Sequence, residues 1–150
     1  MTSKESVDNF LKCKNLAVVG VSRKSGKFGN AIYKELKKKG LNIYGVNPSL
    51  KFIEGDKCYS NLKELEGKVD AVVNVVSPNQ TTSVVKEANE IGVKNIWMQQ
   101  GSESEEAIKY CQENKINEIH KECILMFADP VKSIHGVHKW IWKILGKLPN

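Results

Sequence analysis

The sequence has no long hydrophobic run, no closely spaced cysteine pair and no continuous basic stripe. A helix that spans a membrane needs about 18 consecutive apolar residues, and no stretch approaches that length. The polar, acid-containing N-terminus argues against a secretory signal. Because Cys13, Cys58, Cys111 and Cys123 lack Cys-x-x-Cys spacing, we expect reduced thiols in a cytoplasmic protein rather than a disulfide framework. Acidic residues interrupt the basic ones, so the net charge of +6 indicates solvated helix faces and a local anion site rather than nucleic-acid binding.

The composition, 150 residues with 41% hydrophobic and 27% charged, is that of one globular domain. Expected strands alternate with expected helices, and most strands are near-continuous apolar runs. This pattern predicts a single-domain, Rossmann-like, doubly wound α/β fold, with a mostly parallel sheet and helices on both faces. The expected strands span 16–20, 41–47, 57–59, 70–76, 93–98 and 115–119, and the helices span about 3–12, 30–39, 78–91, a stretch capped by Ser102 or Ser104, and 131–146.

One stretch, Leu16–Asn30, has the order of a phosphate-binding corner. Four apolar residues run into Gly20, a short basic segment follows, and a helical pattern begins after Gly29. In a doubly wound fold, the N–H groups of such a loop and the positive end of the helix dipole face an anion. The stretch therefore predicts a site for a phosphorylated ligand. The alternative is that the two glycines serve only the turn and its packing.

A dinucleotide site usually shows G-x-G-x-x-G at the first turn and an acid at the end of the second strand, which binds the ribose diol. Neither feature is present here. Gly20 is followed by Val21-Ser22 and six further residues before Gly29, so the second glycine of the motif is missing, and the second strand ends in Val46-Asn47-Pro48. Both departures argue against NAD, although Lys51 leaves NADP open.

In combination, the motifs resemble those of the stand-alone CoA-binding proteins. They are VVGxS-x6-G, a strand ending in VNP, DAVVNVVSP and a strand ending in WMQQG. The fold of that family is similar to the N-terminal CoA-binding domain of the succinyl-CoA synthetase α subunit. The resemblance covers about residues 10–129 and implies a domain that binds coenzyme A or an acyl-CoA across the carboxyl ends of the strands.

Coenzyme A carries a diphosphate and a 3′-phosphate, so its site needs donors and cations. The residues that the resemblance implies lie in the loops that follow the strands. They are Gly20, Ser22, Arg23, Lys24 and Lys27 for the phosphates; Lys51 for the 3′-phosphate; Asn47 and Pro48 for the nucleotide end; Val76, Ser77 and Pro78 as an apolar wall; and Gln99 and Gly101 for the pantetheine amides.

The resemblance argues against catalysis, because the phosphorylated histidine of the synthetase lies outside its CoA-binding domain. We assign no catalytic residue and no metal site. His135 and His138 stand at i, i+3 without an assured third ligand. Cys123 is interpreted as a core residue, with a mixed disulfide to the CoA thiol as the alternative.

The expected function is that of a CoA sensor, carrier or regulatory module, acting alone or with a protein partner or second copy. Two alternatives stay open at this point. One is an NAD(P)-dependent oxidoreductase-like domain. The other is an interaction module that binds no nucleotide and works through the amphipathic, tryptophan-rich helix at 131–146, which otherwise docks on the domain or on a second copy.

Overall fold

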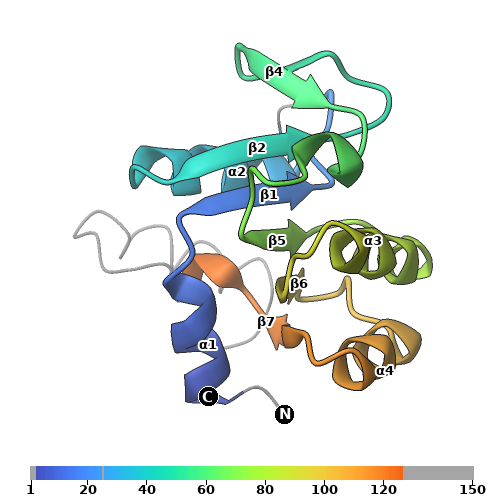
Figure 1. Cartoon of the computed structure of the whole chain (residues 1–150). Helices are drawn as coiled ribbons and strands as arrows, with labels where there is room; N and C mark the ends of the chain where they lie inside the picture. Colours follow the sequence, from blue (N-terminus) through green and yellow to red (C-terminus); the bar gives the residue numbers. More distant parts are fainter. Residues whose placement is uncertain (1–2, 25, 127–150) are drawn as a thin grey trace.

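A computed structural model of the chain describes residues 3–24 and 26–126, and within them seven strands form one sheet (Figure 1). The strand order is β3-β4-β2-β1-β5-β6-β7, and every neighbouring pair is parallel except β3 and β4. The strands are β1 (Asn15–Val19), β2 (Asn42–Val46), β3 (Phe52–Ile53), β4 (Asp56–Tyr59), β5 (Ala71–Asn74), β6 (Asn95–Gln99) and β7 (Asn117–Glu122). The α-helices are α1 (Lys4–Leu11), α2 (Phe28–Lys38), α3 (Pro78–Glu90) and α4 (Glu105–Glu113), and the 3-10 helices are η1 (Leu62–Leu65) and η2 (Ile124–Met126).

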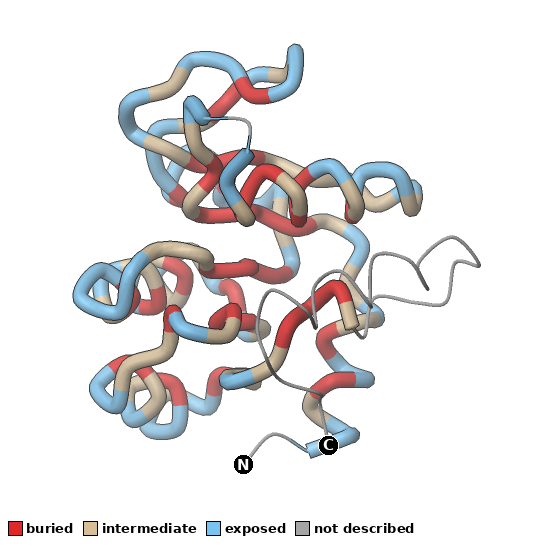
Figure 2. Tube along the Cα trace, turned by 180° about the vertical axis from the view of Figure 1, so that it is seen from behind, coloured by how far each residue is buried: buried red, intermediate tan, exposed pale blue. Residues whose placement is uncertain are grey.

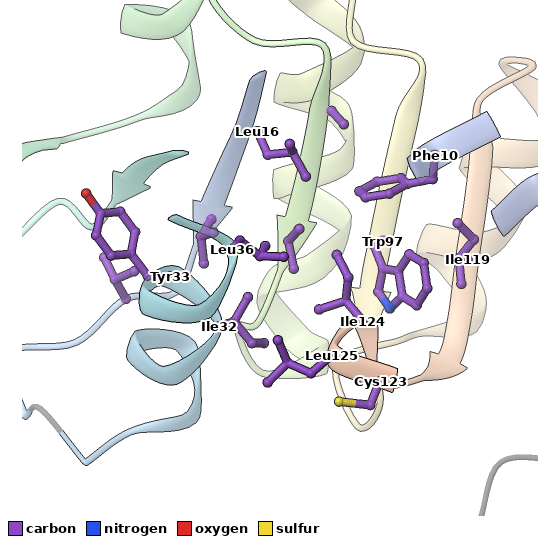
Figure 3. Close-up of a cluster of buried hydrophobic side chains, with 14 of the residues drawn as sticks. Phe10, Leu16, Ile32, Tyr33, Leu36, Trp97, Ile119, Cys123, Ile124 and Leu125 are labelled. Carbon is purple, nitrogen blue, oxygen red and sulfur yellow. The ribbon is translucent and has the colours of Figure 1, made fainter. Parts of the chain in front are cut away.

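Helices cover both faces of the sheet, so the fold class predicted from the sequence is confirmed. On one face, α1, α2 and η2 enclose a cluster that includes Phe10, Trp97 and Leu125 (Figure 3). On the other face, α3, α4 and η1 pack against alternate residues of the same strands, such as Ala17. The central strands β1 and β5 are buried along almost their whole length because each is covered twice (Figure 2).

Several helix boundaries follow from capping residues that the sequence displays. Ser3 Oγ accepts a hydrogen bond from Ser6 N, and Ser104 Oγ accepts one from Ala107 N. Gly40 and Gly92 follow α2 and α3 with φ of +84° and +85°, a backbone conformation that favours glycine.

Several boundaries differ from the predictions; for example, β5 is shorter at both ends than the expected 70–76, and β6 begins at Asn95 rather than Val93. The helix α2 begins at Phe28 rather than Asn30, and the hairpin strand β3 was not expected. The last strand begins at Asn117 rather than Lys115, because Lys115 adopts φ +56° in the turn after α4 and cannot extend the strand. The helix expected at 131–146, together with His135 and His138, lies outside the described residues.

The topology creates a crevice beside β1. The chain leaves β1 for β2 on one side and later returns to β5 on the other. At such a switch point the loops after neighbouring strands diverge, and ligands of open α/β sheets bind in the gap.

Candidate functional site

Two adjoining hollows lie at the carboxyl ends of β1, β2 and β5. One, of about 430 Å³, is lined by the loop after β1, the first residues of α2, Asn47, and three residues that follow β5. The other, of about 460 Å³, extends along the basic part of the loop to Leu50. Both include Ser22, Lys27 and Asn47, so they form one crevice across the switch point.

Two glycines allow the walls of the crevice to approach each other. Gly20 has φ +117°, and a Cβ atom there would lie 3.0 Å from the carbonyl carbon of Val75. A Cβ atom on Gly29 would lie 2.5 Å from the carbonyl oxygen of Gly20, closer than real side chains come. The glycines therefore have the packing role considered above. That role is compatible with a ligand site. The close approach brings the start of α2 and the end of β5 to the loop after β1, and these three segments form the walls of the crevice.

The loop after β1 is held by a side chain that the sequence analysis missed, the buried Asn30 of α2. Its Oδ1 accepts a hydrogen bond from Ser22 N at 2.7 Å. Its Nδ2 donates to the carbonyl oxygens of Ser22 at 2.8 Å and Lys24 at 3.3 Å. In addition, Lys24 N donates to Ser22 Oγ at 3.1 Å. These two loop N–H groups are thus engaged within the protein, contrary to the expectation that the loop N–H groups face an anion.

Asn47 holds the same loop from the β2 side. Its Nδ2 donates to the carbonyl oxygen of Val21 at 2.7 Å, and its Oδ1 accepts from Ser49 N at 2.7 Å. Asn47 therefore joins the ends of β1 and β2.

Positive charge concentrates along the crevice. Arg23, Lys24 and Lys27 line it, and no acidic residue is among the described residues that form its walls. The helix α2 begins there with Lys27 in the N-cap position and no side-chain cap, so the partial positive charge of the first turn faces the same side. This combination attracts a multivalent anion.

The crevice brings together seven of the residues predicted from the sequence: Gly20, Ser22, Arg23, Lys24, Lys27, Asn47 and Val76. The other six do not line it. Pro48, Lys51, Ser77 and Gly101 are exposed on neighbouring loops, and Pro78 is exposed at the first position of α3. Ser77 Oγ donates to Asn79 Oδ1. Gln99 is buried, and its Oε1 accepts from Ile124 N at 3.1 Å.

A family model described as the CoA binding domain matches residues 14–129, most of the described fold and all of the crevice. The chain belongs to the CoA-binding domain family. The resemblance stated from the motifs is thereby confirmed.

Relatives of this CoA-binding domain include stand-alone chains and parts of larger enzymes. The ADP-forming acetate–CoA ligase of Methanocaldococcus jannaschii is 36% identical over 117 residues, which are 78% of this chain and 16% of the ligase. The uncharacterized protein YneT of Bacillus subtilis is 32% identical over 123 residues, 81% of this chain and 91% of YneT. Among solved structures, a conserved hypothetical protein from Pyrococcus furiosus has a TM-score of 0.71 and 40% identity, and covers 74% of this chain and 96% of its own.

In this CoA-binding domain, the thiol of Cys123 is buried among core residues, which agrees with the core interpretation. Burial raises the pKa of that thiol, although the nearby amide of Gln99 opposes the effect. The disulfide alternative is untested. Within the described ranges, no three metal-ligating side chains converge, and no helix has the length and apolarity needed to cross a bilayer.

Proposed function

We propose that this chain binds coenzyme A or an acyl-CoA across the carboxyl ends of β1, β2 and β5 and acts as a sensor, carrier or regulatory module without a catalytic step of its own. One observation carries the proposal: the crevice at the switch point combines three cations and an uncapped helix start with no acid in its described walls. A diphosphate needs this environment, and the family to which the chain belongs supports it.

The arrangement of the walls suggests how the ligand lies. The diphosphate meets Arg23, Lys24 and Lys27, and the Ser22 hydroxyl donates to it. The nucleotide end extends past Asn47 and Pro48 towards Lys51. The pantetheine arm passes Val76, which lines the crevice, and continues beyond it over the exposed Ser77 and Pro78 towards Gly101.

The proposal is tested by calorimetric titration with CoA, 3′-dephospho-CoA, NAD and NADP, after mass spectrometry for co-purified ligand. We expect CoA to bind, and to bind more weakly without its 3′-phosphate. A heat of binding on titration with NADP, and none with CoA, would overturn the proposal in favour of an oxidoreductase-like domain. No binding of any of the four would favour the interaction module.

The cations provide a sharper test. Replacing both Lys24 and Lys27 by Ala should weaken CoA binding by about tenfold or more, because each exposed ammonium contributes about 1 kcal/mol to holding a phosphate. Lys109→Ala is the matched control. Lys109 is exposed on α4 and lies 3.9 Å from Glu113, away from the crevice. Equal affinities for the double variant and the control would contradict the proposed phosphate site.

The relatives suggest a cellular context for the module. Several are acetate–CoA ligases in which the CoA-binding region is a small part of a longer chain. We propose that this chain presents CoA to a protein partner or to a second copy, and that it does so in the cytoplasm, where its four free thiols remain reduced. Light scattering of the chain with and without CoA tests whether a second copy takes part.

A further inference from the structure

The side-chain amide of Asn30 makes to the loop after β1 the pair of hydrogen bonds that the main chain of a neighbouring strand makes in a sheet. It offers one acceptor and one donor group, as a peptide bond does, and it uses both on Ser22: N–H to Oδ1 at 2.7 Å, and Nδ2 to the carbonyl oxygen at 2.8 Å. The second Nδ2 hydrogen serves Lys24 O at 3.3 Å. Asn30 is only 1% exposed, and both of its amide hydrogens are engaged, so it has no donor left for a ligand.

The consequence lies in what remains available on the loop. Ser22 N and Lys24 N both donate inside the protein, and Lys24 O accepts from Lys27 N as well as from Asn30. Ser22 Oγ accepts from Lys24 N, which leaves its own hydroxyl hydrogen to donate outwards. At these two positions, the groups that can meet an anion are side chains.

We propose that Asn30 is a positioning residue of the CoA site, which fixes the loop so that side chains rather than the main-chain N–H groups of Ser22 and Lys24 hold the phosphates. The inference rests on the proposed function. It defines the site by the Ser22 hydroxyl, the Arg23 guanidinium and the Lys24 ammonium, carried by residues 22–24, which the hydrogen bonds of Asn30 hold in place before the ligand arrives. A rigid loop lowers the entropy lost on binding.

Recognition of the phosphates by side chains predicts two observations that recognition by main-chain N–H groups does not. The affinity for CoA should fall steeply with salt, because the charges that carry it are exposed. The amide protons of Ser22 and Lys24 should be protected from exchange without ligand, and CoA should shift their resonances little.

The test uses Asn30→Ala and the isosteric Asn30→Asp. Asn30→Asp keeps an acceptor for Ser22 N and removes both donors. Because aspartate has the same size and shape as asparagine, this variant provides the test should the alanine variant fail to fold. Asn117→Ala is the matched control: Asn117 Nδ2 donates to Ser6 O at 2.9 Å and Asn95 Oδ1 at 3.1 Å, at the opposite, amino end of the sheet. Amide exchange of Ser22 and Lys24 is measured by NMR without ligand, and CoA affinity by calorimetry at low and high salt.

We expect both Asn30 variants to lose the protection of the Ser22 amide and to bind CoA about tenfold more weakly, whereas Asn117→Ala loses stability without losing affinity. Unchanged CoA affinity in folded Asn30 variants would overturn the inference. So would rapid exchange of Ser22 in the unaltered chain, or a large CoA-induced shift of its amide. Failure of the unaltered chain to bind CoA would refute the proposed function, and the exchange data alone would then decide whether Asn30 holds the loop.

Discussion

Gly20 and Gly29 have no side chain, and this allows the loop after β1 to contact both α2 and the end of β5. The nearest atoms to a Cβ on Gly29 would be main-chain atoms of Gly20, and those to a Cβ on Gly20 would include main-chain atoms of Val75. Main-chain neighbours cannot rotate away as a flexible side chain does. At this point the crevice tolerates no added methyl group without movement of a whole segment.

We therefore expect Gly29→Ala to lower the free energy of unfolding by about 1–3 kcal/mol, the usual effect of overpacking. Gly26→Ala is the control, since a Cβ there would have no atom within 4 Å, and it should change stability by less than about 0.5 kcal/mol. Urea denaturation of both variants measures the difference. Equal stabilities would show that α2 shifts freely against β1.

The carboxylate of Asp56 ties the hairpin β3–β4 to α2. It accepts hydrogen bonds from Lys37 Nζ and from Tyr33 OH, the latter at 2.6 Å. The bond from Lys37, and after it the bond from Tyr33, lower the pKa of Asp56 below its ordinary value of 3.8. A carboxyl whose pKa is depressed by folding stabilises the folded state above that ordinary value, and the contribution is lost as the pH falls through the folded-state pKa.

Asp56→Asn should accordingly destabilise the chain at pH 7, by about 1 kcal/mol or less because the pair is partly exposed. The difference from the unaltered chain should shrink as the pH falls below 3.8. Thermal unfolding from pH 7 to pH 2.5 follows it. Glu113→Gln, which removes an exposed partner of Lys109, should show no such trend. A difference that is constant with pH would exclude an ionic contribution from Asp56.

A buried chain of hydrogen bonds connects three neighbouring elements behind the crevice wall. Asn74 Nδ2, at the end of β5, donates to Thr81 Oγ1 of α3 at 2.9 Å, and that hydroxyl donates to the carbonyl oxygen of Ser102, after β6, at 2.5 Å. The three residues are buried. These hydrogen bonds hold the start of α3 against the sheet. They thereby also fix the crevice wall at Val75 and Val76.

Thr81→Val keeps the shape of the side chain but leaves Asn74 Nδ2 and Ser102 O unpaired, at a cost of about 1–3 kcal/mol. The neighbouring Thr82→Val should be nearly neutral, because the Thr82 hydroxyl is only half-buried and lies 3.5 Å from Ser104 Oγ. Chemical denaturation compares the two. We also expect Thr81→Val to weaken CoA binding, and a loss of stability without a loss of affinity would show that α3 is held by other contacts.

On the scale of the whole molecule, the two-sided core protects three of the four cysteines. Cys58, Cys111 and Cys123 are buried, and burial raises the pKa of Cys111 to about 12. Cys13 is only half-buried. The thiolate is the reactive form, so a thiol that is both buried and of high pKa reacts slowly.

A chromogenic thiol reagent at pH 8 should therefore modify one thiol quickly in the native chain and all four after denaturation. Cys13→Ser should remove the fast phase. A fast phase that survives this substitution would show that the sheet opens near one of the buried cysteines.

The sequence predicted the central part of this architecture because burial on both faces leaves a strong local pattern. Apolar runs identified β1, β2, β5 and β6, and Ser3 marked one helix start. A second start was expected at Ser102 or Ser104, and the structure has Ser104 as the cap. The edges were less predictable. Two-residue β3 was not expected, because it depends on its pairing with β4. The strand expected at 115–119 overlaps β7 only over residues 117–119, because the polar residues of β7 form no apolar run.

The candidate site divides in the same way. Residues of one short loop lie near one another in space whatever the rest of the fold does. The residues Gly20, Arg23, Lys24 and Lys27 could therefore be predicted as one site. Asn30 was not, because a side chain that reaches back to a loop leaves no periodic signal. Gln99 was expected at the ligand, whereas its side chain turns towards Ile124, a contact that depends on how η2 packs.

The irregular strand β7 also bears on how copies of the chain behave at high concentration. It is the last strand in the sheet order, its register against β6 shifts between Trp97 and Gln99, and Lys121 within it is exposed with φ +62°. A bulged strand that carries a lysine is a poor template for pairing with a strand of another molecule. This strand thus disfavours the edge-to-edge aggregation to which regular parallel sheets are prone.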